Sequence, residues 1–223
     1  MLSRTNRLKH PLQHFAAVPL SRETLDEVLA PYRRPNDKVS EWMQAGALEP
    51  LRRGLYLTSE FLSQAPACLP LVANHLYGPS CVSLDFALAW HGLIPEGVAE
   101  VTSATPRPSR ILHNARGRFS YHHLPLKYYT VGQELGASND GFSFLIASPA
   151  KALCDRLVLA RNLPLLSRGA MRQWLLDDLR LDPKLLSEMD LSDVRGCLAT
   201  GFKHRQLGTL LAVLKPLQLE LAG

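Results

Sequence analysis

The stretch LEPLRRGLYLT, residues 48–58, sets how the first 60 residues fold. Its two ends, LEPL and LYLT, are short and mainly apolar, and Gly54 lies between them. Glycine adopts a positive φ without steric cost, so a short connection that contains glycine between two such segments predicts a β-hairpin. Arg52 and Arg53 then lie at or beside the turn. The stretch therefore predicts a hairpin with a positively charged tip.

A helix is expected before this hairpin, over the segment SRETLDEVLAPY. Ser21 is a suitable N-cap, and Leu25, Val28 and Leu29 recur at helical spacing. Residues 3–17 could form a further helix, interrupted or started by Pro11.

A second helix is expected to begin at Asn36 or Asp37, which are both good caps, and to end at Gly46. Three residues at the spacing i, i+3, i+4 form its expected inward face: Val39, Trp42 and Met43. The order of helices followed by a hairpin is that of a winged helix-turn-helix domain, with residues 36–45 as the recognition helix and the hairpin as the wing. In that arrangement Arg52 and Arg53 face a phosphate backbone. The alternative is an ordinary charged turn exposed to water.

The rest of the chain predicts an α+β domain with a helical tail. The polar segment TSEFLSQAPA is typical of an interdomain link, which gives domains of residues 1–60 and 61–223. VAEVTSAT, GRFSYHHL and FSFLIA have the composition of strands, and PRPSRILHNARG is expected to be a basic loop between the first two. FSFLIA leads into a helix that is capped by Ser148, with Pro149 in its first turn. The fold class is α+β, with an N-terminal winged helix-turn-helix.

Positive charge is concentrated in one block. The net charge is +5 and the pI is near 9.2, a mild preference for anionic partners. Residues 101–133 hold no Asp or Glu and five basic residues, which are Arg107, Arg110, Arg116, Arg118 and Lys127. This block is either a second basic surface, for DNA or an acidic partner, or a solvated strand edge.

No motif of an enzyme is found. GxSxG, the phosphate-binding loop GxxxxGK[ST], HExxH and GxGxxG are all missing from the sequence. The eight histidines are dispersed, and the four cysteines form no CxxC pair, so buried thiols are expected. His91 lies at the end of the segment SLDFALAWHG, just before Gly92. Lys151 and Asp155 are interpreted as an ordinary i, i+4 pair on a helix. We therefore expect no catalytic residue, no metal and no cofactor.

No targeting or membrane segment is expected. The N-terminus has no continuous apolar stretch of the kind found in secretory signals, and no window approaches the ~20 apolar residues of a membrane helix. These features predict a cytoplasmic protein.

Five motifs in series carry a resemblance. LRRGLYLT, SCVSLDFALAWHGLIPE, VTSAT, GRFSYHHL and FLIASPAKALCD, in this order, resemble the AbiEi antitoxin family of type IV abortive-infection toxin-antitoxin systems. The resemblance covers roughly residues 20–165. It implies a winged-helix domain that binds repeats in its own promoter as a transcriptional repressor, and a C-terminal domain with antitoxin activity. The implied partners are promoter DNA and a nucleotidyltransferase-like toxin. The resemblance implies that the antitoxin opposes the effect of this toxin without needing a stable complex with it.

The resemblance places the recognition helix at Asn36–Ala45 and the wing at Leu48–Thr58. Relatives usually have lysine or arginine before the glycine that ends this helix, whereas this chain has Gln44 and Ala45, with Glu41 one turn earlier. The expected DNA-binding residues are Arg33, Arg34, Asn36, Lys38, Ser40, Gln44, Arg52 and Arg53. A side-chain amide such as that of Gln44 can read an adenine edge.

Two other functions remain open on the sequence. One is a winged-helix domain fused to a nuclease or hydrolase that uses His91 or the basic block. The other is a ligand-responsive winged-helix regulator, which would have a sizeable apolar pocket with a few polar groups.

Overall fold

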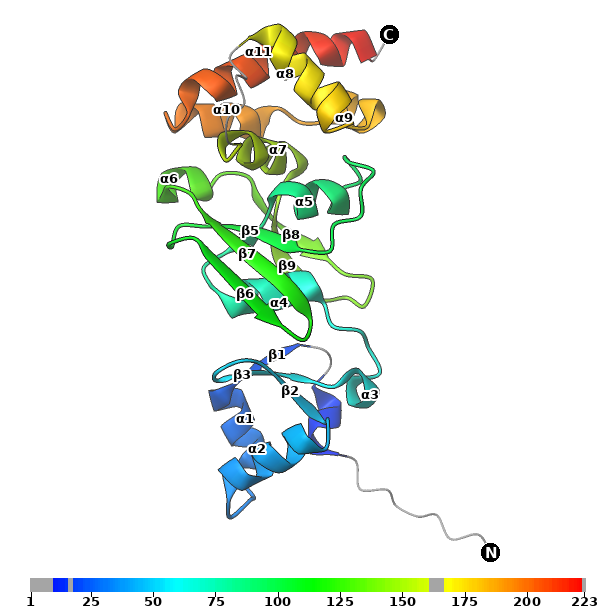
Figure 1. The fold of residues 1–223 in the computed structure, drawn as a ribbon, viewed down its shortest axis with the longest axis vertical. Coiled ribbons are helices and arrows are strands. Elements are labelled where there is room, and N and C mark those ends of the chain that lie inside the picture. The colour runs from blue at the N-terminus through cyan, green and yellow to red at the C-terminus, as the bar shows by residue number, and fades with distance from the viewer. Residues whose placement is uncertain (1–9, 16–17, 161–166, 222–223) are drawn as a thin grey trace, which may run out of the picture.

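The structure of the protein is a computed structural model, which describes residues 10–15, 18–160 and 167–221. The molecule is elongated, with a three-stranded sheet and its helices at one end and a six-stranded sheet with the C-terminal helices at the other (Figure 1). The expected helix over residues 3–17 falls largely outside the described residues. Within them, Pro11–His14 forms a short 3-10 helix, η1. No described helix is both long enough and apolar enough to span a bilayer.

The first sheet is antiparallel, in the order β1-β3-β2, and two helices lie against it. Its elements are β1 (Pro19–Ser21), α1 (Arg22–Leu29), α2 (Pro35–Gln44), β2 (Leu48–Arg52) and β3 (Leu55–Thr58). Ser21 caps α1 as predicted, because its side chain accepts a hydrogen bond from the Thr24 N–H at 3.1 Å. Strand β1 was not predicted. Three residues before a helix carry too weak a pattern, and they become a strand only by pairing with β3.

Helix α2 differs from the prediction at its start. Neither Asn36 nor Asp37 caps it: Pro35 occupies the first turn and Arg34 stands at the N-cap without a side-chain cap. Gly46, at φ +68°, ends the helix as predicted. The inward face is made by Val39 and Trp42, whereas Met43 is 36% exposed and does not face the core as expected.

The hairpin is confirmed. Arg52 pairs with Leu55, and Gly54 takes a φ of +76° in the turn between them. The ladder shifts register between Pro50 and Arg52, as expected where a bulge increases the twist of a hairpin.

Both faces of the three-stranded sheet are covered, so the hairpin does not project freely. One face contributes Leu20, Leu48 and Tyr56 to a small core with α1 and α2. The other face contributes Leu51, Leu55 and Leu57 to the large core of the six-stranded sheet. The predicted domain boundary at residue 60 stays a prediction. The structure shows that the leucines of the hairpin pack into the core of the six-stranded sheet.

The second sheet is mixed, in the order β6-β7-β5-β4-β9-β8. Its strands are β4 (Cys81–Val82), β5 (Val101–Thr105), β6 (Arg110–Asn114), β7 (Gly117–His123), β8 (Gln133–Ala137) and β9 (Ser143–Ala147). The expected basic loop PRPSRILHNARG was wrong in part, because β6 forms inside it and pairs antiparallel with β7. The segment RILHN does not alternate polar and apolar residues, so its sequence gives no strand signal before a partner is known.

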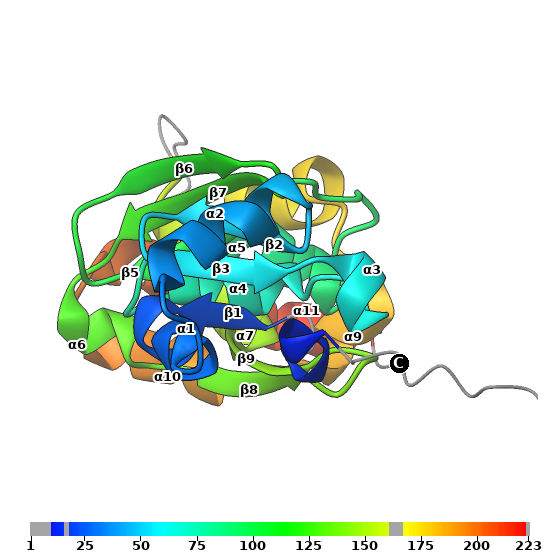
Figure 2. The same ribbon diagram turned by 90° about the horizontal axis from the view of Figure 1, so that it is seen from below.

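Helices cover both faces of this sheet. The helices that follow β3 in the chain are α3 (Glu60–Ser63), α4 (Leu69–Leu76), α5 (Leu84–Trp90), α6 (Leu126–Tyr129), α7 (Pro149–Val158), α8 (Arg168–Gln173), the π-helical turn η2 (Trp174–Asp178), α9 (Pro183–Glu188), α10 (Ser192–Ala199) and α11 (His204–Leu221). Helix α4 lies between the two sheets, α5 and α7 cover the opposite face, and α8 to α11 stack beyond α7 (Figures 1 and 2). Ser148 caps α7 as predicted, by accepting from the Lys151 N–H at 3.2 Å.

The pair on α7 is not ordinary. The Lys151 ammonium contacts the Asp155 carboxylate with both side chains at 2% exposure or less, and the ammonium lies 4.0 Å from the Tyr128 ring centroid. Ser83 occupies the N-cap of α5, yet its hydroxyl donates to Asp155 at 2.6 Å and does not cap. The buried charges are thus paired with each other and with a hydroxyl, as burial requires.

Candidate nucleic-acid interface

The exposed side of α2 is polar and close to neutral. Lys38 lies against the rings of Tyr32 and Trp42, at 5.4 and 5.9 Å, and its ammonium is 2.6 Å from Glu41. Arg34 stands 3.7 Å from Asp37, with both side chains more than 70% exposed. Each positive charge of the helix thus has an acidic neighbour within one turn. The electrostatic attraction of this helix for phosphate is therefore small.

The remaining polar side chains of α2 differ in how firmly they are held. Asn36 accepts a hydrogen bond from the Arg22 guanidinium at 2.7 Å, and the Ser40 hydroxyl donates to the Asn36 carbonyl oxygen at 3.1 Å. Gln44 is exposed in the last turn. Arg33 is exposed in the turn before the helix. Gln44 is thus the best-presented amide for contact with a base edge.

The wing is docked onto the second sheet through its polar atoms as well as its leucines. Arg116, in the β6–β7 turn, donates to Glu49 of β2 at 2.7 to 3.1 Å and to Glu60 of α3. Asn114 donates to the Leu51 carbonyl at 3.4 Å. Because Glu49 and Arg116 are each about one-fifth exposed, this pair is sheltered from water and holds the wing in place.

The two arginines of the wing tip play different parts. Arg52 reaches the end of α4, where its guanidinium lies 3.5 Å from the His75 carbonyl oxygen. Burial lowers the pKa of His75, and the Arg52 charge lowers it further. The Arg53 side chain is exposed in the turn. Arg53 is thus the freer of the two for a phosphate.

Two arginines of the basic block, Arg107 and Arg110, lie at the end of α4 beside Tyr77. The guanidinium of Arg107 lies 4.9 Å from the Tyr77 ring centroid and donates to the Gly78 carbonyl at 2.8 Å, and that of Arg110 lies 5.5 Å from the same ring. Tyr77 in turn packs edge-on against Tyr121. Stacking on a tyrosine orients each guanidinium without neutralising its charge.

The other members of the block are placed differently. Arg118 pairs with Glu100 at 3.0 Å, and Arg116 is occupied by its two glutamates. Lys127 is exposed on α6. The block 101–133 therefore splits into two acid-paired arginines and three other cations.

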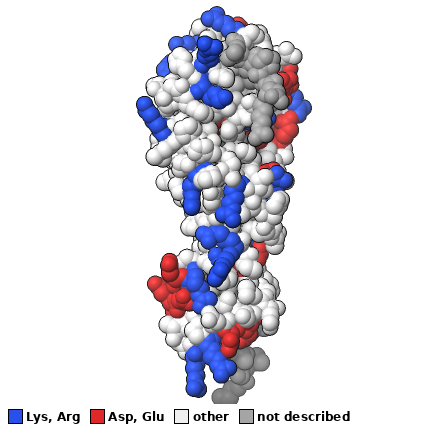
Figure 3. Space-filling view, turned by 60° about the vertical axis from the view of Figure 1, so that its left-hand side comes forward, with Lys and Arg blue, Asp and Glu red and all other residues white. Residues whose placement is uncertain are grey.

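Seven cations of the two predicted sets form what we term the basic face: Arg33, Arg34, Arg52, Arg53, Arg107, Arg110 and Lys127. They lie on the α1–α2 turn, the β2–β3 turn, the loop into β6, and α6, which follow one side of the molecule, at the left of Figures 1 and 2. Figure 3 shows this side, on which Lys and Arg recur from end to end and Asp and Glu are few in the middle. This continuity could not be predicted from the sequence, because the wing and the block are about 50 residues apart and come together only in the folded chain.

The remaining sequence candidates lie elsewhere. His91 is the C-cap of α5, with Nε2 2.9 Å from the Ala147 carbonyl oxygen, and all four cysteines are buried free thiols as expected.

Comparison with known proteins gives little. No family model matches the chain, and no curated protein matches it. Among solved structures, the chain is similar to the crystal structure of the RV2827C protein from Mycobacterium tuberculosis, with a TM-score of 0.45 and 13% identity over 90% of this chain and 78% of that one. A likeness at that level supports no statement about function, so function is argued from this chain's own residues.

Proposed function

We propose that this protein is a DNA-binding antitoxin that represses its own promoter, as its resemblance to the AbiEi family implies, and that it holds DNA along the basic face. The observation that carries the DNA-binding part is the continuity of exposed cations from the α1–α2 turn, across the wing tip, to Arg107 and Arg110. Guanidinium groups along one side of an elongated molecule suit successive phosphates of a duplex.

Affinity and specificity would come from different residues. The cations of the basic face contact phosphates and supply affinity for any sequence. Gln44, with Asn36 and Ser40 on the same helix, reads base edges in the major groove. Because α2 itself is nearly neutral, the affinity rests on the wing and on the second sheet more than on the recognition helix.

The test is a salt titration of operator binding by fluorescence anisotropy. Arg53→Ala and Arg110→Ala are each expected to reduce the slope of log K against log salt by ~0.9 for every phosphate that the variant no longer neutralises. Arg118→Ala is the matched control: it removes the same charge from the same sequence block, but from an arginine already paired with Glu100. Equal slopes in wild type, Arg53→Ala and Arg110→Ala would reject the basic face as the DNA surface.

The antitoxin part of the proposal is tested separately, by co-expression with the product of the neighbouring reading frame, which the resemblance implies is a nucleotidyltransferase-like toxin. We expect that enzyme to arrest growth alone and growth to recover when this protein is present. A neighbouring frame whose product is harmless would contradict the antitoxin assignment and leave DNA binding untouched. Metal-dependent cleavage of DNA by the purified protein would instead favour the alternative of a winged-helix nuclease.

A further inference from the structure

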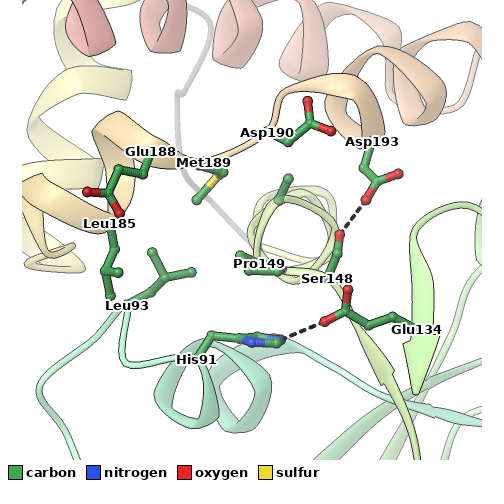
Figure 4. A pocket seen from close by; sticks show the side chains of 11 residues that line it. His91, Leu93, Glu134, Ser148, Pro149, Leu185, Glu188, Met189, Asp190 and Asp193 are labelled. Atoms are coloured by element: carbon green, nitrogen blue, oxygen red, sulfur yellow. Dashed lines mark hydrogen bonds and ion pairs between the residues drawn. The ribbon is translucent and has the colours of Figure 1, made fainter. Parts of the chain in front are cut away.

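A cavity of about 390 Å³ lies beside the six-stranded sheet and takes no part in the proposed DNA contact (Figure 4). Five parts of the chain line it: the end of α5 and the loop after it, β8, the start of α7, α9, and the start of α10. The volume falls in the range of pockets that bind small molecules. Walls drawn from several elements make it a feature of the fold and not of one loop.

The lining combines carboxylates with apolar side chains. The carboxylates are Glu134, Glu188, Asp190 and Asp193, and the larger apolar residues are Leu93, Pro149, Leu185 and Met189. Figure 4 shows Glu188 at one end beside Leu185 and Met189, Glu134 and Asp193 near Ser148 at the other end, and Pro149 between them. None of its 11 lining residues is Lys or Arg. The cavity therefore has two acidic ends and an apolar middle.

Within the described residues, none of the carboxylates that line this cavity forms an ion pair with a lysine or an arginine. A neighbouring cavity, also of about 390 Å³, has four carboxylates in its lining: Asp85, Glu96, Glu100 and Asp178. The first three have an arginine partner: Arg156, Arg180 and Arg118, respectively. The carboxylates of the first cavity have no such arginine partners among the described residues.

Within the described residues, the carboxylates of the first cavity form one ion pair, in which His91 Nε2 lies 3.7 Å from Glu134. Asp193 accepts the Ser148 hydroxyl, a neutral donor. Hydrogen bonds from the Ser192 hydroxyl and N–H, and the charge of Arg195, lower the pKa of Asp190, so that carboxylate is ionised at neutral pH. Several carboxylates without a lysine or arginine ion pair in a concave site concentrate a negative potential there, in a chain whose net charge is +5.

We propose that this cavity binds an aliphatic diamine, with one ammonium group at Glu188 and the other between Glu134 and Asp193. The methylene chain lies over Leu93, Pro149 and Met189. An ammonium group offers three donors and a compact charge to the carboxylates, and the methylenes remove apolar wall from water. A bare metal ion would use the carboxylates and leave the apolar middle unfilled. This inference is independent of DNA binding, and it would make the protein responsive to a small cation.

The experiment is isothermal titration calorimetry on the full chain without DNA. The probes are 1,4-diaminobutane and 1,5-diaminopentane, compared with butylamine and MgCl₂ at matched ionic strength. We expect saturable one-site binding of a diamine, with butylamine weaker by about tenfold or more because it fills only one acidic end. Absence of saturable diamine binding, or equal binding of MgCl₂, would overturn the proposal.

Variants locate the site. Glu188→Gln is expected to raise the diamine Kd by about tenfold and to leave the diamine no better bound than butylamine. Glu188 and Glu134 are exposed, so their substitution leaves the core intact, and thermal unfolding monitors this. The matched control is Glu27→Gln, which makes the same charge change on exposed helix α1. A loss of affinity in Glu27→Gln equal to that in Glu188→Gln would show a general charge effect and refute the site.

Discussion

Arg52 and Arg53 are adjacent in sequence and differ in what they touch. The Arg52 guanidinium lies against the end of α4, close to the His75 carbonyl, while Arg53 is exposed in the turn. The difference follows from their places in the hairpin, because Arg52 is the last residue of β2 whereas Arg53 lies in the turn beyond it. It can be measured on His75, whose pKa is lowered by burial and then by Arg52.

Removing the Arg52 charge is expected to raise the pKa of His75. Arg52→Ala eliminates one positive charge that disfavours the imidazolium, and burial still keeps the pKa below its ordinary value of about 6.5. Arg53→Ala is the control and should leave the His75 titration unchanged. The measurement is an NMR pH titration of the imidazole protons; identical curves for Arg52→Ala and wild type would contradict the docking of Arg52 on α4.

The same histidine makes stability depend on pH. Its pKa is lower in the folded chain than in the unfolded chain, so the unfolded chain binds the proton more readily. The stability contribution is therefore present above about pH 6.5 and declines as the pH falls through the folded pKa. Urea unfolding at a series of pH values should show a smaller decline for Arg52→Ala, and an equal decline would count against the assignment.

Gln44 is expected to control sequence preference. It is exposed in the last turn of α2, the helix that we propose enters the major groove. Gln44→Ala should change the difference in binding free energy between operator variants that differ at one base pair by about 1–3 kcal/mol. Lys38→Ala serves as the comparison, because Lys38 is already paired with Glu41. A uniform loss across all variants would show that Gln44 does not read a base.

At the scale of elements, α7 carries the most demanding interaction of the core. Lys151 and Asp155 are one helical turn apart and fully buried, with Ser83 as a third partner. The spacing is readable from sequence, but the burial is not, since it depends on α5, α6 and α10 packing around α7. A buried charge without its partner is far more costly than an exposed one.

Lys151→Met is therefore expected to lower the free energy of unfolding by about 3–5 kcal/mol, since it leaves the Asp155 carboxylate buried with only a hydroxyl partner. Adding Asp155→Asn should recover part of the loss, because the amide is neutral and can still accept from Ser83. Denaturant unfolding of the single and double variants makes the comparison. A double variant less stable than Lys151→Met would argue that the charge of Asp155 is satisfied in another way.

At the scale of the whole molecule, the two sheets share the wing. Leu51, Leu55 and Leu57 belong to the larger core, and Arg116 reaches back from the β6–β7 turn to Glu49. This packing sets the tip of the wing against the end of α4, where Arg52 approaches the His75 carbonyl and where Arg107 and Arg110 lie over the Tyr77 ring. The docking of the wing and the DNA contact that we propose thus depend on different arginines of the same region.

The two roles should separate experimentally. Arg116→Ala is expected to lower the free energy of unfolding by about 1–3 kcal/mol, because its hydrogen bonds to Glu49 and Glu60 disappear, with little change in the salt slope of DNA binding. Arg53→Ala should do the reverse. Unfolding curves and salt titrations of both variants test this, and a stable Arg116→Ala protein with a reduced slope would exchange the two assignments.

Features controlled by local backbone chemistry could be predicted from the sequence. Ser21 and Ser148 cap their helices, Gly54 turns the hairpin and Gly46 ends α2, because each acts through neighbouring residues alone. The α+β class followed from the same local patterns. Strands β1 and β6 could not be predicted, since each is short and gains its hydrogen bonds only from a partner strand.

Which charges remain available depends on the folded arrangement. Arg110 and Arg118 look alike in the sequence, yet one stacks on Tyr77 and the other pairs with Glu100. The cavity proposed to bind a diamine likewise draws His91, Glu134 and Glu188 from distant segments. Local residues were enough to set where most helices and turns begin and end, because those depend on φ, ψ and adjacent hydrogen bonds. Electrostatic partners act through space, so the fold had to bring them together.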